Sequence, residues 1–124
     1  MNFRQLLEKI IESDKNIRFA AVFDRYGIVR EKIHRDDTSQ MLDEYENQNM
    51  LREAASSWYH RKSLAQKLGK GHYTMTVYDN LIRVTMPLSS DYFIVISHDK
   101  LDDQSPIAKR ILKVLDANKI DSFE

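Results

Sequence analysis

Histidine is the side chain in this sequence best suited to metal binding or proton transfer, and the chain contains four. They stand far apart, at His34, His60, His72 and His98. No two of them have the i, i+4 spacing of a helical metal site or the spacing of a zinc finger, and there is no cysteine to supply a thiolate. The sequence therefore predicts neither a metal site nor a disulfide.

Three other patterns have the composition of chemical sites without their spacing. Asp99, Asp102 and Asp103 lack the glycine and the final glutamate of a calcium loop. Gly69-Lys70-Gly71 lacks the further glycine and the hydroxyl residue of a phosphate loop, so we interpret it as a helix cap and the entry to a strand. The serines of the central region have no identifiable base beside them. We predict no catalytic residue, no cofactor and no enzymatic activity.

One local cluster, Trp58-Tyr59-His60-Arg61-Lys62, mixes aromatic and basic side chains. Such a mixture can hold single-stranded nucleic acid through stacking and phosphate contacts. On a helix, however, Trp58 shares a face with Leu51 and Ala55, whereas Arg61 and Lys62 turn partly away. We favour an anchor in the core or at an interface over contact with nucleic acid. The overall balance of 19 basic and 19 acidic residues points the same way.

Charge is distributed unevenly along the middle of the chain. Residues 36–46 contain five acidic side chains and no basic one, whereas residues 52–70 contain five basic side chains and one acidic one. Acids at the start of a helix and bases at its end complement the helix dipole. Two such helices packed antiparallel across a twofold axis would also set each acidic end against a basic end. Small residues at 54–57 would allow close approach, and we favour this homodimer.

Length and composition indicate a single domain over residues 1–124. The fractions of 42% hydrophobic and 31% charged residues are typical of a soluble globular protein. The longest apolar run, residues 92–96, is far too short to span a bilayer. Residues 1–15 lack the unbroken apolar segment of a signal peptide. We therefore expect a cytoplasmic protein without membrane contact.

Hydrophobic periodicity gives the order of the elements. We predict a helix at 3–13, strands at 17–23 and 28–33, a long helix from about 43 to 68, strands at 73–78, 81–86 and 92–97, and a helix opened by Ser105 as N-cap and Pro106. Apolar residues on both faces of the first, third and fifth strands require cover on both sides. The predicted fold is α/β (α+β), a single five-stranded antiparallel sheet with helices on both faces in the order α-ββ-α-βββ-α. The terminal helices should share one face.

Local signals refine the boundaries. Gly27 should take a positive φ in the first hairpin, and Gly69 should end the long helix. Asp43 with Glu46 and Asp37 with Gln40 both form capping boxes, and we favour the later start, leaving residues 36–42 as a loop or short turn. Phe19 is expected in the core, where truncation to alanine would cost about 3–5 kcal/mol. In the C-terminal tail, Ile120 and Phe123 could dock.

The hairpin of residues 17–29 resembles that of the roadblock family of dynein light chains and its profilin-like relatives. Residues 17–20, the spaced Trp58, Arg61 and Leu64, and Thr85-Met86-Pro87-Leu88 resemble a group of short, functionally uncharacterised archaeal proteins. The resemblance spans nearly the whole chain. It implies non-enzymatic dimers that bind and regulate small GTPases or serve as assembly platforms.

Two hypotheses follow. The leading one is a non-enzymatic homodimeric protein-binding module, a regulator or scaffold of a partner such as a small GTPase. Its candidate interface consists of Met50, Ala54, Ser57, Trp58, Arg61, Lys62 and Leu64, with Asp43, Glu44 and Glu46 at the acidic end. The alternative is a small-molecule sensor of profilin/PAS-like fold that binds a ligand between sheet and helix. Its lining would include Tyr26, Tyr73, Tyr78 and Tyr92.

Overall fold

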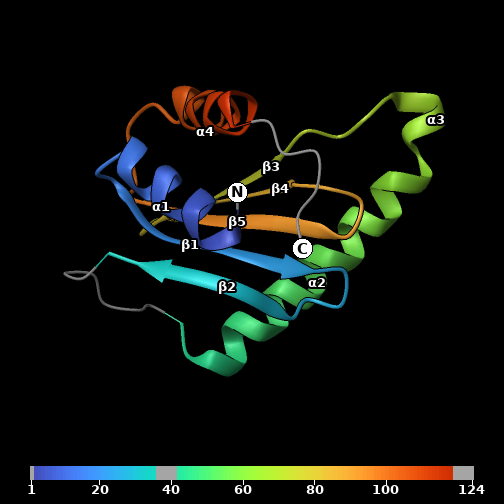
Figure 1. Ribbon diagram of the computed structural model, residues 1–124, viewed down its shortest axis with the longest axis horizontal. Helices are drawn as coiled ribbons and strands as arrows, with labels where there is room; N and C mark the ends of the chain where they lie inside the picture. Colours follow the sequence, from blue (N-terminus) through green and yellow to red (C-terminus); the bar gives the residue numbers. More distant parts are fainter. Residues whose placement is uncertain (1, 36–41, 119–124) are drawn as a thin grey trace.

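The computed structural model describes residues 2–35 and 42–118, and Figure 1 shows how its elements are arranged. The helices are α1 (Phe3–Ser13), α2 (Glu44–Ser63), α3 (Ala65–Leu68) and α4 (Ser105–Ala117). The strands are β1 (Ile17–Asp24), β2 (Val29–His34), β3 (Thr74–Val77), β4 (Ile82–Pro87) and β5 (Tyr92–His98). The predicted element order is confirmed. The one addition is α3, a short helix that follows a break in the long one.

The five strands form one antiparallel sheet in the order β2-β1-β5-β4-β3. The hairpin β1–β2 and the meander β3–β4–β5 join through β1 and β5, which pair from Ile17 with His98 to Asp24 with Tyr92. An isolated two-stranded hairpin is marginal in water, so this junction is what makes the first hairpin stable. The prediction of a single five-stranded layer is confirmed.

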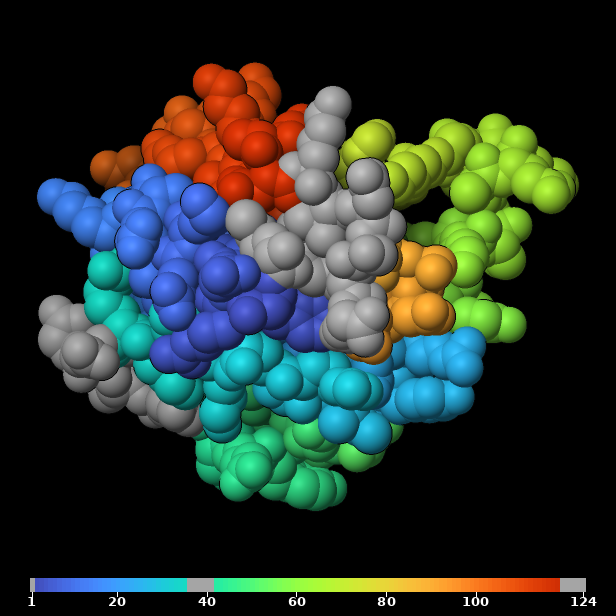
Figure 2. Space-filling view, viewed as in Figure 1, coloured from blue at the N-terminus to red at the C-terminus, as the bar shows by residue number. Residues whose placement is uncertain are grey.

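Side-chain alternation divides the interior into two cores. On one face, Ala20, Val22, Ile94 and Ile96 pack with apolar side chains of α1 and α4. On the other face, β1 and β5 present Ala21, Phe23, Phe93 and Val95 to Leu51, Ala55 and Trp58 of α2. Figure 2 shows α1 and α4 side by side on the first face, with α2 and α3 emerging beyond it. The predicted division of the helices between the two faces is confirmed.

Gly27 sets the first hairpin and the position of α2. Its φ of 82° lies in the left-handed region that favours glycine. The Asp24 carboxylate accepts hydrogen bonds from the backbone N–H groups of Tyr26 and Ile28, at 2.9 and 3.0 Å. The Gly27 carbonyl in turn accepts a 2.7 Å hydrogen bond from Gln48 Nε2, which ties the turn to α2.

Three predictions about individual elements are wrong. Phe19 is only half-buried, because α2 covers the middle of the sheet and leaves this end of β1 beside a cavity. β3 lies at an edge of the sheet, and its last two residues, Thr76 and Val77, are exposed. The N-cap of α4 is Gln104 rather than Ser105, because the Asp103 carboxylate accepts the Ser105 backbone N–H at 3.0 Å and draws Ser105 into the first turn.

Two other predictions fall partly or wholly on residues that the structure does not describe. The loop between β2 and α2 was expected at 36–42, of which residue 42 alone is described. The docking of Ile120 and Phe123 lies outside the described residues altogether. Among residues 2–35 and 42–118, no helix has the length and apolar character needed to cross a membrane.

A buried ionic cluster ties α1, β5 and α4 together. Asp14 follows α1 and receives hydrogen bonds from His98 Nε2, at 2.9 Å, and from Arg110 of α4. Burial alone would raise the pKa of Asp14, but hydrogen bonds from the Asn16 backbone and His98, together with the charges of His98 and Arg110, outweigh burial and lower the pKa below its usual 3.8. The resulting stabilisation is present at neutral pH and is lost as the pH falls through that lowered pKa.

Candidate interface on the central helix

The central helix α2 begins at the predicted acidic capping box. The Asp43 carboxylate accepts the Glu46 backbone N–H at 2.7 Å, and the Glu46 carboxylate accepts the Asp43 backbone N–H at 3.0 Å. Glu44 adds a third carboxylate in the first turn, and all three acidic residues are exposed. The favoured later start of the helix is confirmed, and negative charge gathers where the helix dipole favours it.

Trp58 anchors the middle of α2 to the sheet. Trp58 is 5% exposed, and its ring stacks on Phe93 with 6.3 Å between ring centroids. Its indole N–H donates a 3.0 Å hydrogen bond to Thr85 Oγ1, which also bonds Thr74 Oγ1 at 2.6 Å. Trp58 is therefore a core anchor and offers little surface to a second chain. Arg61 covers its outer side, with Cζ 5.0 Å from the ring centroid.

The helix breaks at Leu64 instead of continuing to Leu68. Leu64 is the C-cap of α2, its N–H bonds the Arg61 carbonyl at 3.1 Å, and α3 follows as a single turn. Leu64 is 48% and Leu68 is 79% exposed, and the prediction of one continuous helix to residue 68 is wrong. These leucines are exposed because the helix is longer than the sheet face that it covers. Trp58 is the last buried residue of α2, and the chain beyond it projects past the sheet (Figures 1 and 2).

Five of the candidate interface residues share one side of this helix, which we call the α2 flank. The α2 flank consists of Met50, Ala54, Ser57, Arg61 and Leu64. Their spacing alternates four and three residues, as in the seam between two packed helices. Met50 Sδ lies 3.2 Å from Arg83 Nη1 of β4, so the flank runs along the side of α2 that faces β4. The first three residues are half-buried and the last two are exposed.

The edge strand β3 and the segment that leads into it add apolar surface. Nine large apolar side chains are exposed among the described residues, and five of them fall between residues 64 and 78. These five are Leu64, Leu68, Tyr73, Val77 and Tyr78. β3 also has sheet hydrogen bonds on one side alone, because no described strand follows it in the strand order. Sequence reasoning missed this contribution, because it treated β3 as a fully covered strand.

The basic end of α2 borders a hollow of about 380 Å³. Arg61 and Lys62 line it together with Arg25 and Lys70, and Asp91 is the only acidic residue among its described lining. Trp58, Phe93 and Pro87 contribute apolar surface. The capping-box carboxylates stand at the opposite end of the helix. The predicted separation of charge along α2 is therefore present in the fold.

The tyrosines expected to line a ligand cavity lie elsewhere. Tyr26, Tyr73, Tyr78 and Tyr92 line neither the hollow at the basic end of α2 nor the cavity beside its first half. Tyr26 lies in the β1–β2 turn and is 63% exposed. Within the described ranges, no three His, Asp or Glu side chains are grouped so that they could hold a metal ion.

Comparison with known proteins connects this geometry to a fold. No family model matches the chain, and no curated protein matches it. Among solved structures, a Roadblock/LC7 domain from Streptomyces avermitilis is 11% identical, with 94% of each chain covered and a TM-score of 0.67. The gliding protein MglB from Thermus thermophilus is 13% identical over 92% of this chain and 83% of that chain, with a TM-score of 0.71. MglC from Myxococcus xanthus is 19% identical over 95% and 96%, with a TM-score of 0.61. At these identities the likeness concerns the fold, and the chain has the fold of Roadblock/LC7 domains.

Proposed function

We propose that this chain is a non-enzymatic homodimeric module of a single domain, acting as regulator or scaffold of a protein partner such as a small GTPase. The observation that carries the proposal is the α2 flank, a row of exposed and half-buried residues at helix-packing spacing. It lies beside an open sheet edge and between ends of opposite charge. A second copy related by a twofold axis would cover all three features at once.

The proposed dimer places two α2 helices antiparallel, with Ala54 and Ser57 near the axis. Small side chains there permit close approach of the two helices, and Met50 and Leu64 supply apolar contact at either side. The acidic start of each helix would meet the hollow lined by Arg61 and Lys62 of the other copy. Exposed ion pairs contribute only about 0–1 kcal/mol each, so apolar contact holds the dimer while charge sets its register.

The choice of a protein partner is supported by the resemblance to roadblock proteins and by the fold that the chain shares with MglB and MglC. Affinity capture followed by mass spectrometry tests this part of the proposal. Recovery of a GTP-binding protein would support a role as a GTPase regulator. If no GTP-binding protein is captured, the proposal that the partner is a small GTPase is wrong. The cytoplasmic setting and the closeness to archaeal proteins stay predictions.

Cysteine cross-linking tests the proposed axis, because the chain has no cysteine of its own. In Ser57→Cys, or in Ala54→Cys, mild oxidation should produce a disulfide-linked dimer. The reason is that a disulfide requires Cα atoms within about 7 Å, a distance that only residues near the axis can reach. Non-reducing electrophoresis gives the fraction that is linked.

Ser105→Cys is the matched control, since Ser105 is exposed at the start of α4 on the opposite face of the sheet. It should remain monomeric on the same gel. Equal linking at positions 105 and 57 would show random collision. If neither Ala54→Cys nor Ser57→Cys forms a disulfide-linked dimer, the axis lies elsewhere.

A further inference from the structure

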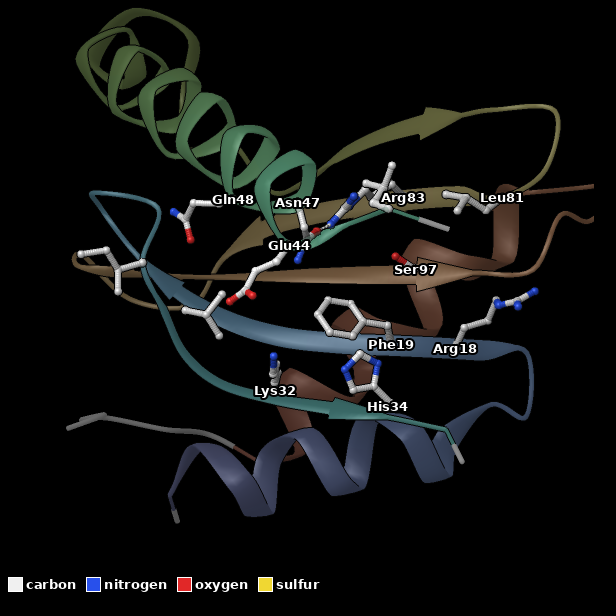
Figure 3. A pocket seen from close by; sticks show the side chains of 13 residues that line it. Arg18, Phe19, Lys32, His34, Glu44, Asn47, Gln48, Leu81, Arg83 and Ser97 are labelled. Carbon is white, nitrogen blue, oxygen red and sulfur yellow. Dashed lines mark hydrogen bonds between the residues drawn. The ribbon is translucent and has the colours of Figure 1, made fainter. Parts of the chain in front are cut away.

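A cavity of about 490 Å³ lies beside the first half of α2, on the sheet face that this helix covers (Figure 3). Its floor is one row of side chains across four strands. Strand register pairs His34 of β2 with Phe19 of β1, Phe19 with Ser97 of β5, and Ser97 with Arg83 of β4. The next rows of the sheet are covered by Leu51, Ala55 and Trp58 of α2. The row His34–Phe19–Ser97–Arg83 is left open because the helix passes to one side of it.

Arg83 is a buried cation whose partners in the described chain are neutral. It is 7% exposed, and its guanidinium donates to Asn47 Oδ1 at 2.5 Å and contacts Met50 Sδ at 3.2 Å. No carboxylate of the described residues forms an ion pair with it. Burial lowers the pKa of this guanidinium, and an electrostatic interaction with Tyr78 opposes the shift in part. A buried charge without a counter-ion is costly, and a bound anion would supply one.

The charges around the cavity favour a single negative charge. Its other cations are Arg18 and Lys32, and Glu44 is the one carboxylate of its described lining. Arg18 is already paired with Asp99 at 3.1 Å, and in Figure 3 its guanidinium points away from the cavity. The opposite charges of Lys32 and Glu44 in the lining offset each other. About one positive charge, that of Arg83, is left to be matched.

The rest of the floor suits a flat apolar group. The rings of Phe19 and His34 lie 4.8 Å apart and are half-exposed. Burial lowers the pKa of His34, and the charge of Lys32 lowers it further, so both favour the neutral imidazole. The Ser97 hydroxyl, between this pair and Arg83, has no hydrogen-bond partner among residues 2–35 and 42–118. The volume lies within the range of about 300–1,000 Å³ that is usual for small-molecule sites.

We propose that this cavity binds a small aromatic carboxylate, with its carboxylate on Arg83 and Ser97 and its ring on Phe19 and His34. The arginine fork matches a carboxylate in two hydrogen bonds. A phosphate ester would bring a second negative charge that faces Glu44 without compensation. This site goes beyond the proposed dimer and adds a ligand to a protein-binding module; it meets the α2 flank only where Arg83 contacts Met50.

Titration of the 15N-labelled full chain with benzoate, followed by NMR, tests the site. A nine-atom ligand that fills part of the cavity should bind with a Kd on the order of 1 mM. Backbone shifts should concentrate at Phe19, His34, Arg83 and Ser97. Benzamide, the neutral analogue, should bind at least tenfold more weakly, and phenyl phosphate should bind no more tightly than benzoate.

Arg83→Met keeps the volume and removes the charge, so benzoate binding should fall at least tenfold. Its thermal midpoint should be unchanged or higher, because no ion pair is broken. The control Arg52→Met removes an exposed arginine from the outer side of α2 and should bind as the wild type does. Phe19→Ala leaves Arg83 in place. This variant should bind benzoate at least threefold more weakly and should bind acetate, itself a weaker ligand, as the wild type does. It therefore tests the site even if Arg83→Met fails to fold.

Four outcomes would overturn the site. They are benzamide binding as tightly as benzoate, phenyl phosphate binding more tightly, unchanged affinity in both variants, and shifts centred on the Trp58 indole. None of these depends on the oligomeric state, so the cavity and the dimer can fail separately.

Discussion

Replacing Trp58 with alanine is expected to lower the free energy of unfolding by about 3–5 kcal/mol, as for other large buried aromatic side chains. The indole is 5% exposed, stacks on Phe93 and hydrogen-bonds Thr85, and it is the last buried residue of α2. Its removal leaves a cavity between helix and sheet, and it releases the half of α2 that carries Ser57 and Arg61. Urea unfolding followed by circular dichroism measures the loss.

Two further variants separate packing from other effects. Trp58→Phe keeps a ring and loses the hydrogen bond to Thr85, so it should cost only about 1–1.5 kcal/mol beyond the difference in size. Tyr59→Ala truncates a neighbouring aromatic residue that is 69% exposed, and it should change stability by no more than about 0.5 kcal/mol. Equal losses for Trp58→Ala and Tyr59→Ala would mean that α2 does not pack on the sheet through Trp58.

Gly27→Ala is expected to cost about 2–6 kcal/mol, which is large for the addition of one methyl group. Gly27 has a φ of 82°, where a side chain adds strain of about 1–3 kcal/mol. A Cβ there would also lie 2.6 Å from the Arg52 Cα and 2.7 Å from its N, both backbone atoms of α2. Overpacking of this kind costs about 1–3 kcal/mol more, because the helix must move away from the turn. Thermal and urea unfolding both report the change.

Gly69→Ala is the matched control for this prediction. Gly69 has a similar φ of 87°, but a Cβ there would meet no atom within 4 Å. The substitution should therefore cost only the backbone strain, about 1–3 kcal/mol. If Gly69→Ala costs as much as Gly27→Ala, the close approach of the turn to α2 has no energetic weight.

Hydrophobic periodicity predicted most of this fold because every element except α3 and β3 repeats one simple pattern over at least six residues. α1 has apolar residues at helical spacing, and β1 and β5 have them on both faces, which required helices on two sides. The short strand β3 was placed correctly in order, but its exposure was not predicted. The pattern of a four-residue strand does not distinguish an edge from a centre, because that difference depends on neighbours in the sheet.

The break at Leu64 could not be predicted from the sequence. The apolar stripe continues through Leu64 and Leu68 without a proline or glycine to stop it, and the helix breaks where it passes the end of the sheet. Phe19 is a similar case, because the four residues that follow it on β1 are buried and the crossing position of α2 leaves Phe19 beside the cavity. Both errors come from the size and placement of layers, which local pattern does not contain.

Side-chain groups from distant parts of the sequence were the least predictable. The ionic cluster joins Asp14 with His98 and Arg110, which are 84 and 96 residues away. The cavity floor joins four strands whose register sets which side chains share a row. The one signal available for that floor was an arginine, Arg83, between apolar residues of a buried strand, and the sequence analysis did not use it. Tyrosines were chosen instead by residue type alone, and they lie elsewhere.

Sedimentation equilibrium is the measurement that tests the proposed homodimer most directly. The wild type should sediment with twice the 14.6 kDa mass of one chain. Raising the salt concentration should weaken the dimer only slightly, because salt screens charges beyond about 8–10 Å and leaves apolar contact unchanged. Arg61→Glu with Lys62→Glu should weaken it about 10- to 100-fold, by setting like charges against the acidic start of the partner helix. Lys109→Glu with Lys113→Glu, a matched reversal on exposed positions of α4, should leave it unchanged. A wild type that remains at 14.6 kDa at every concentration would contradict the dimer, and a doubly reversed α2 variant that dimerises as tightly as the wild type would contradict its placement on the α2 flank.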